Sequence, residues 1–378
     1  MSRRPLLHRL APSSVIVFRA LQLGDMLCAV PALRALRHAL PQARIVLAGL
    51  PWAQQFVNRF PHYLDEFLAF PGHPRLPEQA VRHEELAAFY TGLCERRFDL
   101  ALQLHGSGDV SNDIVSGFGA AAMAGFCRGA AVARARTVLF PYPETGTEPE
   151  RLLFLVEQLG ALPRPAAGEA SPATVDPARA ADTVVPTPQT VAGAQLEFPI
   201  SQQDEDELAA SGVARGLVPG DYLCIHPGAR HRDKCWPARH FAELGDRLAS
   251  EFGIKVVLTG SAQEADLTAE VAKHMRHTPI DAAAPISIGA MAALMRDARL
   301  LLCNDTGVSH IAAGLKLKSV VIFSKADIAR WAPLDRHTHR CIWDPGAERA
   351  AVVLQHARAL LAGTAPSRQR TVGMWPYW

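Results

Sequence analysis

The chain lacks the features of a disulfide-bonded, membrane-spanning or nucleic-acid-binding protein. Its 7 cysteines among 378 residues are odd in number and include no Cys-x-x-Cys pair, which argues against a disulfide framework and a zinc site. No apolar run is long enough to span a bilayer, and residues 15–18 end at Arg19, which predicts a strand rather than a signal peptide. The 39 basic residues are balanced by 37 acidic ones, which argues against a nucleic-acid surface. We therefore expect a cytoplasmic protein that binds no nucleic acid.

The chain does have enough length for two domains and, at 49% hydrophobic residues, enough apolar side chains to fill them. Short aliphatic runs alternate with helical patterns, and this alternation predicts an α/β fold with parallel sheets covered by helices on both faces. The predicted strands are residues 15–18, 44–48, 99–104, 222–226, 255–259, 300–304 and 319–323. The predicted helices are residues 26–40, 204–211, 237–252, 264–274 and 307–315.

The predicted domain boundaries are set by a change of composition in the middle of the chain. Residues 160–200 are rich in proline and alanine and are interpreted as an insertion or linker between domains at 1–159 and 201–378. The last helix is expected to pack back on the N-terminal domain. The acidic run 204–206 is interpreted as the first turn of a helix and not as a metal-binding Asp-x-Asp.

Ligands of open parallel sheets bind beyond the carboxyl ends of the strands, and four polar loops lie at such positions. In the first, residues 19–25, Gly24 allows a tight turn and Asp25 begins the following helix. Asp25 is expected either to cap that helix or to act as a general base. In the second, residues 226–237, three cations within five residues predict an anion site. These cations are Arg230, Arg232 and Lys234.

The other two loops also suit a nucleotide. In residues 259–264, Glu264 is either an ordinary first-turn helix residue or a hydrogen-bond partner for a ribose diol. In residues 304–310, Thr306 and Gly307 place backbone N–H groups at a helix start, where a diphosphate can bind. His310 follows one turn later and either faces the same ligand or packs in the interior. A Gly-x-Gly at residues 106–108 lacks the rest of a dinucleotide fingerprint and is interpreted as a turn.

Three segments resemble the heptosyltransferase-like glycosyltransferases of family 9. They are Gly24-Asp-Met-Leu-Cys-Ala-Val-Pro-Ala-Leu-Arg-Ala-Leu-Arg37, His226-Pro-Gly-Ala229 with Lys234-Cys-Trp-Pro237, and Asn304-Asp-Thr-Gly-Val-Ser-His-Ile-Ala-Ala313. The resemblance extends over about residues 15–345 and implies a GT-B fold, with two Rossmann-like domains facing a central cleft. The N-terminal domain would bind the acceptor and the C-terminal domain the donor.

The resemblance also implies an activity and its residues. It implies inverting transfer of a sugar, typically heptose from ADP-heptose, to lipopolysaccharide or another cell-surface glycan, with no metal or other cofactor. The enzyme would be cytoplasmic, with peripheral contact to the inner membrane. Asp25 would be the catalytic base, and Lys234, Glu264, Asp305, Thr306, Gly307 and His310 would bind the donor. Arg230, Arg232 and Lys325 are expected as further phosphate contacts, and Arg19, Gly24 and His105 on the acceptor side.

General chemistry agrees with these roles. A diphosphate leaving group gains negative charge, which a lysine and a helix N-terminus can stabilise. Two segments depart from the family pattern, however. Residues 323–328 lack its glycine and prolines, and residues 102–112 differ from the segment expected to border an inner-core acceptor. Two alternatives therefore stay open: a GT-B-fold sugar-nucleotide epimerase, which would not need Asp25, and a non-catalytic sugar-nucleotide-binding protein.

Overall fold

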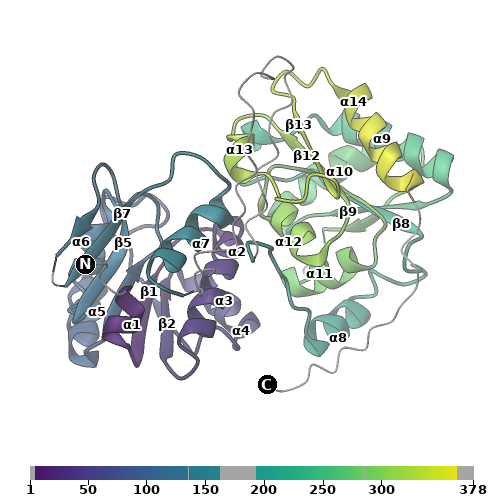
Figure 1. Cartoon of the computed structure of the whole chain (residues 1–378). Helices are drawn as coiled ribbons and strands as arrows, with labels where there is room; N and C mark the ends of the chain where they lie inside the picture. The colour runs from purple at the N-terminus through teal and green to yellow at the C-terminus, as the bar shows by residue number, and fades with distance from the viewer. Residues whose placement is uncertain (1–4, 135, 162–192, 284–285, 364–378) are drawn as a thin grey trace, which may run out of the picture. The chain divides into compact units, whose positions relative to one another are not determined.

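The computed structural model describes residues 5–134, 136–161, 193–283 and 286–363, which form two compact units (Figure 1). The first unit comprises Met1–Ser201, Gly307–Leu315 and Ala326–Asp335, and the second comprises Gln202–Thr306, Lys316–Lys325 and Arg336–Trp378. The chain thus leaves the first unit near residue 201 and returns to it twice. Most of the predicted insertion, residues 162–192, and the aromatic tail at residues 375–378 lie outside the described residues.

The first unit contains a seven-stranded sheet with the order β3-β2-β1-β4-β5-β7-β6. Every neighbouring pair is parallel except β6 and β7. The central strand β1 has its four apolar residues fully buried, as expected for a parallel strand covered on both faces. The strands are β1 Ser14–Phe18, β2 Arg44–Gly49, β3 Glu66–Ala69, β4 Leu100–Gln103, β5 Ala122–Cys127, β6 Val132–Ala133 and β7 Thr137–Pro141.

The helices of the first unit include two that come from the second half of the sequence. The single helix predicted over residues 26–40 is in fact two, α2 and α3, because Pro31 has no N–H and its ring would clash with the preceding turn. The helices are α1 Leu6–Leu10, α2 Leu23–Cys28, α3 Val30–Ala39, α4 Gln54–Arg59, α5 His83–Arg96, α6 Ser111–Ser116, α7 Glu148–Gln158, α12 Gly307–Leu315 and α13 Ile328–Trp331.

The second unit contains a six-stranded, wholly parallel sheet with the order β10-β9-β8-β11-β12-β13. This is the doubly wound order of dinucleotide-binding folds, in which the strand order reverses between the first and fourth strands, here β8 and β11; this is the switch point of the sheet. The strands are β8 Tyr222–His226, β9 Lys255–Thr259, β10 Ile280–Ala282, β11 Leu301–Asn304, β12 Ser319–Phe323 and β13 His339–Trp343. The helices are α8 Gln202–Ser211, α9 Ala238–Phe252, α10 Ala265–His274, α11 Ile288–Arg296 and α14 Ala350–Ala362.

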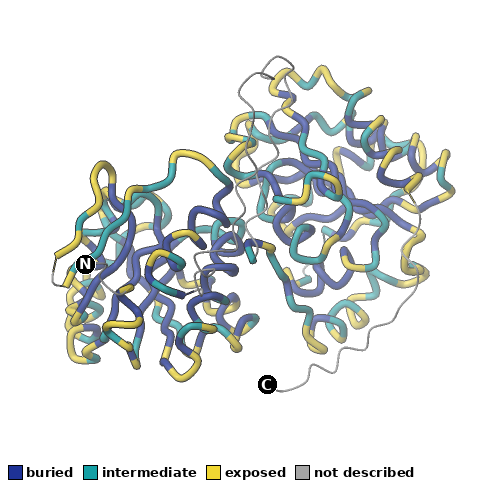
Figure 2. The backbone as a smooth tube through the Cα atoms, viewed as in Figure 1, coloured by how far each residue is buried: buried dark blue, intermediate teal, exposed yellow. Residues whose placement is uncertain are grey.

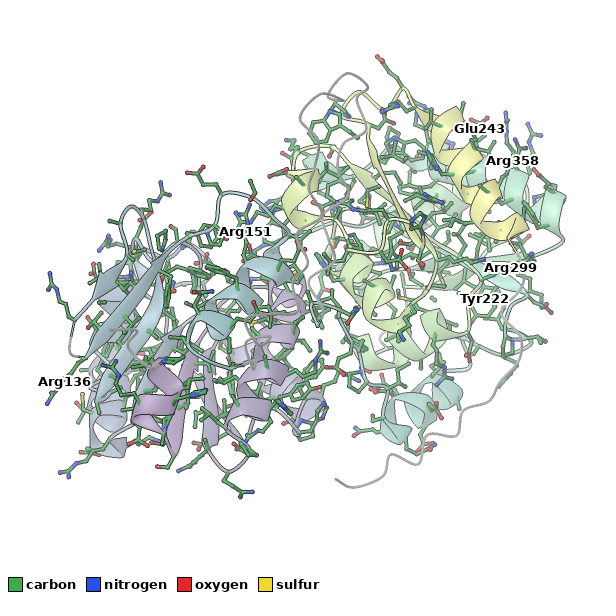
Figure 3. All side chains as sticks on the ribbon, in the orientation of Figure 1. Arg136, Arg151, Tyr222, Glu243, Arg299 and Arg358 are labelled. Carbon is green, nitrogen blue, oxygen red and sulfur yellow. The ribbon has the colours of Figure 1, made fainter. Side chains whose placement is uncertain are left out.

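The last described helix, α14, packs on the second sheet and beside α9. Its expected packing on the N-terminal domain stays a prediction. Arg358 on α14 pairs with Glu251 on α9 at 2.7 Å, and Arg299 donates to the carbonyl of Leu361 at 3.0 Å. The two arginines are labelled in Figure 3. Apolar side chains on its inner face, such as Val353 and Leu361, join the core of the second unit. An amphipathic helix buries its apolar face on the nearest sheet, and that sheet is its own.

Both sheets lie in the interiors of their units, and the outer turns of the helices are exposed (Figure 2). The acidic run 204–206 lies in α8, as the helical interpretation predicted. All seven cysteines are free. Among the described helices, none combines the length and the apolar character that crossing a membrane requires.

Candidate active site

In the first unit, two loops meet beyond the ends of β1 and β4, where the strand order of the sheet reverses. The amide of Ala20, just after β1, donates to Nδ1 of His105 at 3.2 Å. The guanidinium of Arg19 donates to the carbonyl of Leu104, just after β4. Because ligands of such sheets bind at the switch point, these contacts shape the candidate site of this unit.

Asp25 lies beside these loops, in the first turn of α2. It is not the N-cap: that position belongs to Gln22, and Asp25 is the third residue of the helix. Its backbone carbonyl accepts a hydrogen bond from Nε of Arg19 at 2.9 Å. Within the described part of the chain its partly exposed carboxylate accepts no hydrogen bond. Arg19 thus fixes the backbone of Asp25, while the carboxylate stays accessible to a reactant.

Gly24 packs against the start of α12, which brings the first and the fourth predicted loops together. A Cβ at Gly24 would lie 3.0 Å from Cδ2 of His310 and 3.2 Å from Cα of Gly307. His310 is 5% exposed, and its Nδ1 lies 3.8 Å from Sγ of Cys28. Burial raises the pKa of the Cys28 thiol far above its usual value, so this thiol stays protonated. The structure thus supports the packed alternative for His310, and its role in donor binding stays a prediction.

A charge cluster that was not predicted from the sequence lies beside α2, centred on the buried Glu148. Glu148, at the start of α7, accepts from Arg19 at 3.4 Å, from Arg330 at 2.9 Å and from the hydroxyl of Tyr142 at 2.9 Å. Burial alone would raise the pKa of Glu148, but the two guanidiniums and the hydroxyl outweigh it and lower the pKa. Burial likewise disfavours the charge of Arg330, and Glu148, Tyr142 and Asp25 together reverse that effect and raise its pKa. Asp25 therefore lies within electrostatic range of Arg330.

Two residues expected on the acceptor side are buried instead. Arg19 is 0% exposed, and its guanidinium is engaged by backbone carbonyls and Glu148. His105 is 8% exposed and stacks on Phe18 with ring centroids 5.3 Å apart. Burial, and then the charge of Arg19, lower the pKa of His105 to about 3, so its imidazole is neutral. Both side chains support the loops from within rather than offering a surface to a ligand.

In the second unit, Asn304 joins the loops beyond β8 and β11. Its side chain accepts from the amide of Trp236 at 2.9 Å and donates to the carbonyl of Pro227 at 2.7 Å. The indole N–H of Trp236 donates to Asp344 at 2.9 Å. Asn304 and Trp236 belong to two of the family-like motifs, but their contact was not predicted. The signal for it is a polar residue at the end of a buried central strand, because such a group needs hydrogen-bond partners.

The same loops place Lys234 against Asp305. Nζ of Lys234 lies 2.9 Å from Oδ2 of Asp305, with the two side chains 25% and 11% exposed. Thr306, next in the chain, is partly exposed. Two residues predicted from separate motifs to bind the donor are therefore adjacent at the switch point, where an anion would compete with Asp305 for the lysine.

The other predicted phosphate contacts differ in whether a carboxylate already pairs with them. Arg232 forms a bidentate pair with Asp266 at 2.8 and 2.9 Å, and Lys325 pairs with Asp233. Arg230 is exposed. A phosphate would have to displace a carboxylate from Arg232 or Lys325, so their role stays a prediction.

Glu264 is held as a helix-start residue, and within the described segments hydrogen bonds reach one of its two carboxylate oxygens. Oε2 accepts from the amide and hydroxyl of Ser261 at 2.9 and 2.8 Å in a capping box. Oε1 lies 3.9 Å from Nε2 of the buried His226. A Cβ at Gly228 would lie 2.0 Å from Oε1, so only glycine allows this close approach. The helix-start interpretation is supported, and Oε1 keeps the ribose contact open as a prediction.

Comparison with known proteins places the chain among glycosyltransferases. The model of glycosyltransferase family 9 (heptosyltransferase) matches residues 86–355. Lipopolysaccharide heptosyltransferase 3 of Escherichia coli is 31% identical over 130 residues, which are 34% of this chain and 36% of that protein. Lipooligosaccharide heptosyltransferase 2 of Haemophilus ducreyi is 29% identical over 143 residues, 35% and 40% of the two chains. The matched stretch thus spans little more than a third of these curated relatives.

Two solved structures match over nearly the whole described chain. A family 9 glycosyl transferase from Veillonella parvula has a TM-score of 0.71 at 19% identity and covers 93% of this chain and 98% of its own. The Escherichia coli ADP-heptose lipopolysaccharide heptosyltransferase II has a TM-score of 0.64 at 21% identity, with coverages of 92% and 98%. At such identities the likeness shows the fold, and it confirms the GT-B expectation.

Proposed function

Because the chain belongs to glycosyltransferase family 9, we propose that it transfers a sugar from a nucleotide-sugar donor to a cell-surface glycan. The donor is ADP-heptose and the acceptor a lipopolysaccharide or a related glycolipid. The named activities of the matched relatives support this choice. The protein acts in the cytoplasm, at the inner face of the membrane that carries such an acceptor.

The adjacency of Lys234 and Asp305 at the switch point of the second sheet carries the proposal. In this function the donor diphosphate takes the lysine from Asp305, and the N–H groups at Thr306 and Gly307 complete the anion site. The leaving diphosphate gains negative charge as the bond to the sugar breaks, and the cation stabilises that charge most in the transition state. Neither a metal ion nor another cofactor is part of the proposed reaction.

Asp25 is the general base of the proposed reaction. It takes the proton of the acceptor hydroxyl while that oxygen bonds to the anomeric carbon and the bond from this carbon to the diphosphate oxygen breaks. The proton ends on Asp25, the bonding electrons end on the nucleoside diphosphate, and the anomeric configuration inverts. The open carboxylate of Asp25 supports this role.

Two residues of the segment 323–328, Ser324 and Lys325, contact the loop at residues 226–237, which was predicted to bind the donor phosphates. The hydroxyl of Ser324 donates to the carbonyl of Lys234 at 3.3 Å, and Lys325 pairs with Asp233. Both contacts involve residues that depart from the family pattern. We propose that these two contacts adjust the loop at residues 226–237 to the sugar or the base of the donor.

The experiment is a nucleotide-release assay with ADP-, UDP- and GDP-sugars and a panel of glycolipid extracts as acceptors. The expected result is ADP release that depends on both ADP-heptose and an acceptor, with NMR showing an inverted anomeric configuration in the product. Conversion of a sugar nucleotide without any acceptor would favour an epimerase. Tight binding without turnover of any donor would favour a binding protein.

A further inference from the structure

The first unit holds a buried guanidinium, a buried carboxylate and a second, partly buried guanidinium beside the helix that carries Asp25. Arg19 and Glu148 are 0% and 1% exposed, and the side chain of Arg330 is 30% exposed. A buried arginine–glutamate–arginine group is a poor means of stabilising a fold, because the cost of desolvation can exceed the mutual attraction. Apolar residues often replace such groups without loss of stability. Its place beside Asp25 therefore points to a role in position rather than stability.

Arg19 holds a backbone group that the helix itself leaves open. The amide of Ala29 bonds to the carbonyl of Met26, so it does not serve the carbonyl of Asp25, its usual partner four residues back. Nε of Arg19 donates to that carbonyl at 2.9 Å. The same guanidinium donates to the carbonyl of Leu104, beyond the neighbouring strand β4. Arg19 thereby fixes the first turn of α2 relative to the sheet.

We infer that Glu148 is a positioning residue for Asp25, acting through Arg19. Its carboxylate lies between the guanidiniums of Arg19 and Arg330 and fixes the fork that holds the Asp25 carbonyl. Arg19 is buried, and its only carboxylate partner among the described residues is Glu148. The inference rests on the proposed function, in which Asp25 is the base. It adds that the base is placed by a charge cluster that does not touch the substrate.

The test compares two glutamates in the first turn of α7. Glu148→Gln keeps the size of the side chain and removes the charge that orients Arg19. We expect kcat to fall about 10- to 100-fold, the scale set by a misplaced catalytic group, with the donor KM and ADP affinity within about twofold of wild type. The control is Glu150→Gln, since Glu150 is 8% exposed and, among the residues that the structure describes, its carboxylate bonds to Thr147 alone, in a capping box that glutamine can keep. We expect this control to retain wild-type kcat.

A double-mutant cycle separates positioning from general damage. In an Asp25→Asn background the base is already absent, so Glu148→Gln should lower the residual kcat by less than about twofold. Glu148→Asp, which keeps the charge at shorter reach, should restore part of the lost kcat. If Glu148→Gln does not fold, Arg19→Lys takes its place. It keeps the buried charge but lacks the planar fork, and we expect the same loss and the same non-additivity.

The possible results have distinct meanings. Wild-type kcat in Glu148→Gln, an equal loss in Glu150→Gln, or full additivity with Asp25→Asn would overturn the positioning role while leaving the transferase activity standing. Failure of the wild-type protein to transfer sugar from any donor would overturn the proposed function, and the inference with it. A selective, non-additive loss of kcat establishes the inference.

Discussion

Gly24 and Gly307 lie in backbone contact: a Cβ on Gly24 would be 3.2 Å from Cα of Gly307, and a Cβ on Gly307 would be 3.2 Å from the amide nitrogen of Gly24. A side chain at Gly307 would therefore meet the first turn of α2. The two glycines thus allow the first turns of α2 and α12 to meet.

We therefore expect Gly24→Ala to destabilise the protein by about 1–3 kcal/mol, the usual cost of overpacking, since the added methyl would also lie 3.0 Å from the ring of His310. The matched control is Gly92→Ala in α5, where a Cβ meets nothing within 4 Å. Alanine is the better helix former, so Gly92→Ala should be neutral or stabilising by up to about 1 kcal/mol. Chemical denaturation measures both, and equal stabilities would show that the contact at Gly24 can relax.

Lys234→Met should weaken ADP binding by about 1.5–3 kcal/mol, the range for a hydrogen bond to a charged group. The variant loses a cation and also leaves Asp305 unpaired beside the incoming diphosphate. Lys273→Met on α10 is the control, because its exposed pair with Glu270 should contribute little. Calorimetry decides between them. Unchanged affinity in Lys234→Met would move the phosphate site toward Arg230, Arg232 and Lys325.

Asp25→Asn should lower kcat by about 10²- to 10⁴-fold, the effect of a lost general base, with ADP affinity nearly unchanged. The carboxylate accepts no hydrogen bond among the described residues, so the substitution should cost the fold little. Steady-state kinetics and circular dichroism are the measurements. Near-normal turnover in a folded variant would leave Asp25 as an ordinary acidic residue in a helix's first turn.

Transfer should persist in excess chelator, because the proposed anion site relies on Lys234 and backbone N–H groups. The rate of ADP release with and without EDTA measures this. A loss of rate that magnesium or manganese restores would contradict the metal-free reaction and require a new account of the donor site.

The neutral, buried His105 should make the stability of the fold depend on pH. Its pKa is about 3 in the folded state and 6.5 as a reference for the unfolded chain, so between these values the unfolded state binds more protons. The contribution is complete above pH 6.5 and is lost as pH falls toward 3, at up to about 1.4 kcal/mol per pH unit. His105→Asn keeps an acceptor for the amide of Ala20 and should flatten this slope in urea titrations from pH 4 to 7. An unchanged slope would assign it to other groups.

The central strands and their loops could be predicted from sequence because buried parallel strands are continuous apolar runs. Thus β8, β9 and β12 begin and end at the predicted residues. Edge strands such as β3 and β6 have only partly buried or exposed side chains and gave no such signal. Lys234 and Asp305 could be placed from sequence on two loops that follow central strands, but the ion pair between them was not predicted. The charge cluster at Glu148 could not be predicted, since nothing in its local sequence indicates that Arg19 and Arg330 will surround it.

The assignment of α12 and α13 to the first unit has a consequence for synthesis on the ribosome. Residues 307–315 and 326–335 emerge after most of the second sheet has been made, yet they supply His310 to Cys28 and Arg330 to Glu148. Until then the nascent first unit carries Gly24 uncovered and Glu148 with one of its two cations. An isolated fragment of residues 1–201 would stay in that state, so its surface around α2 would differ from that of the finished protein.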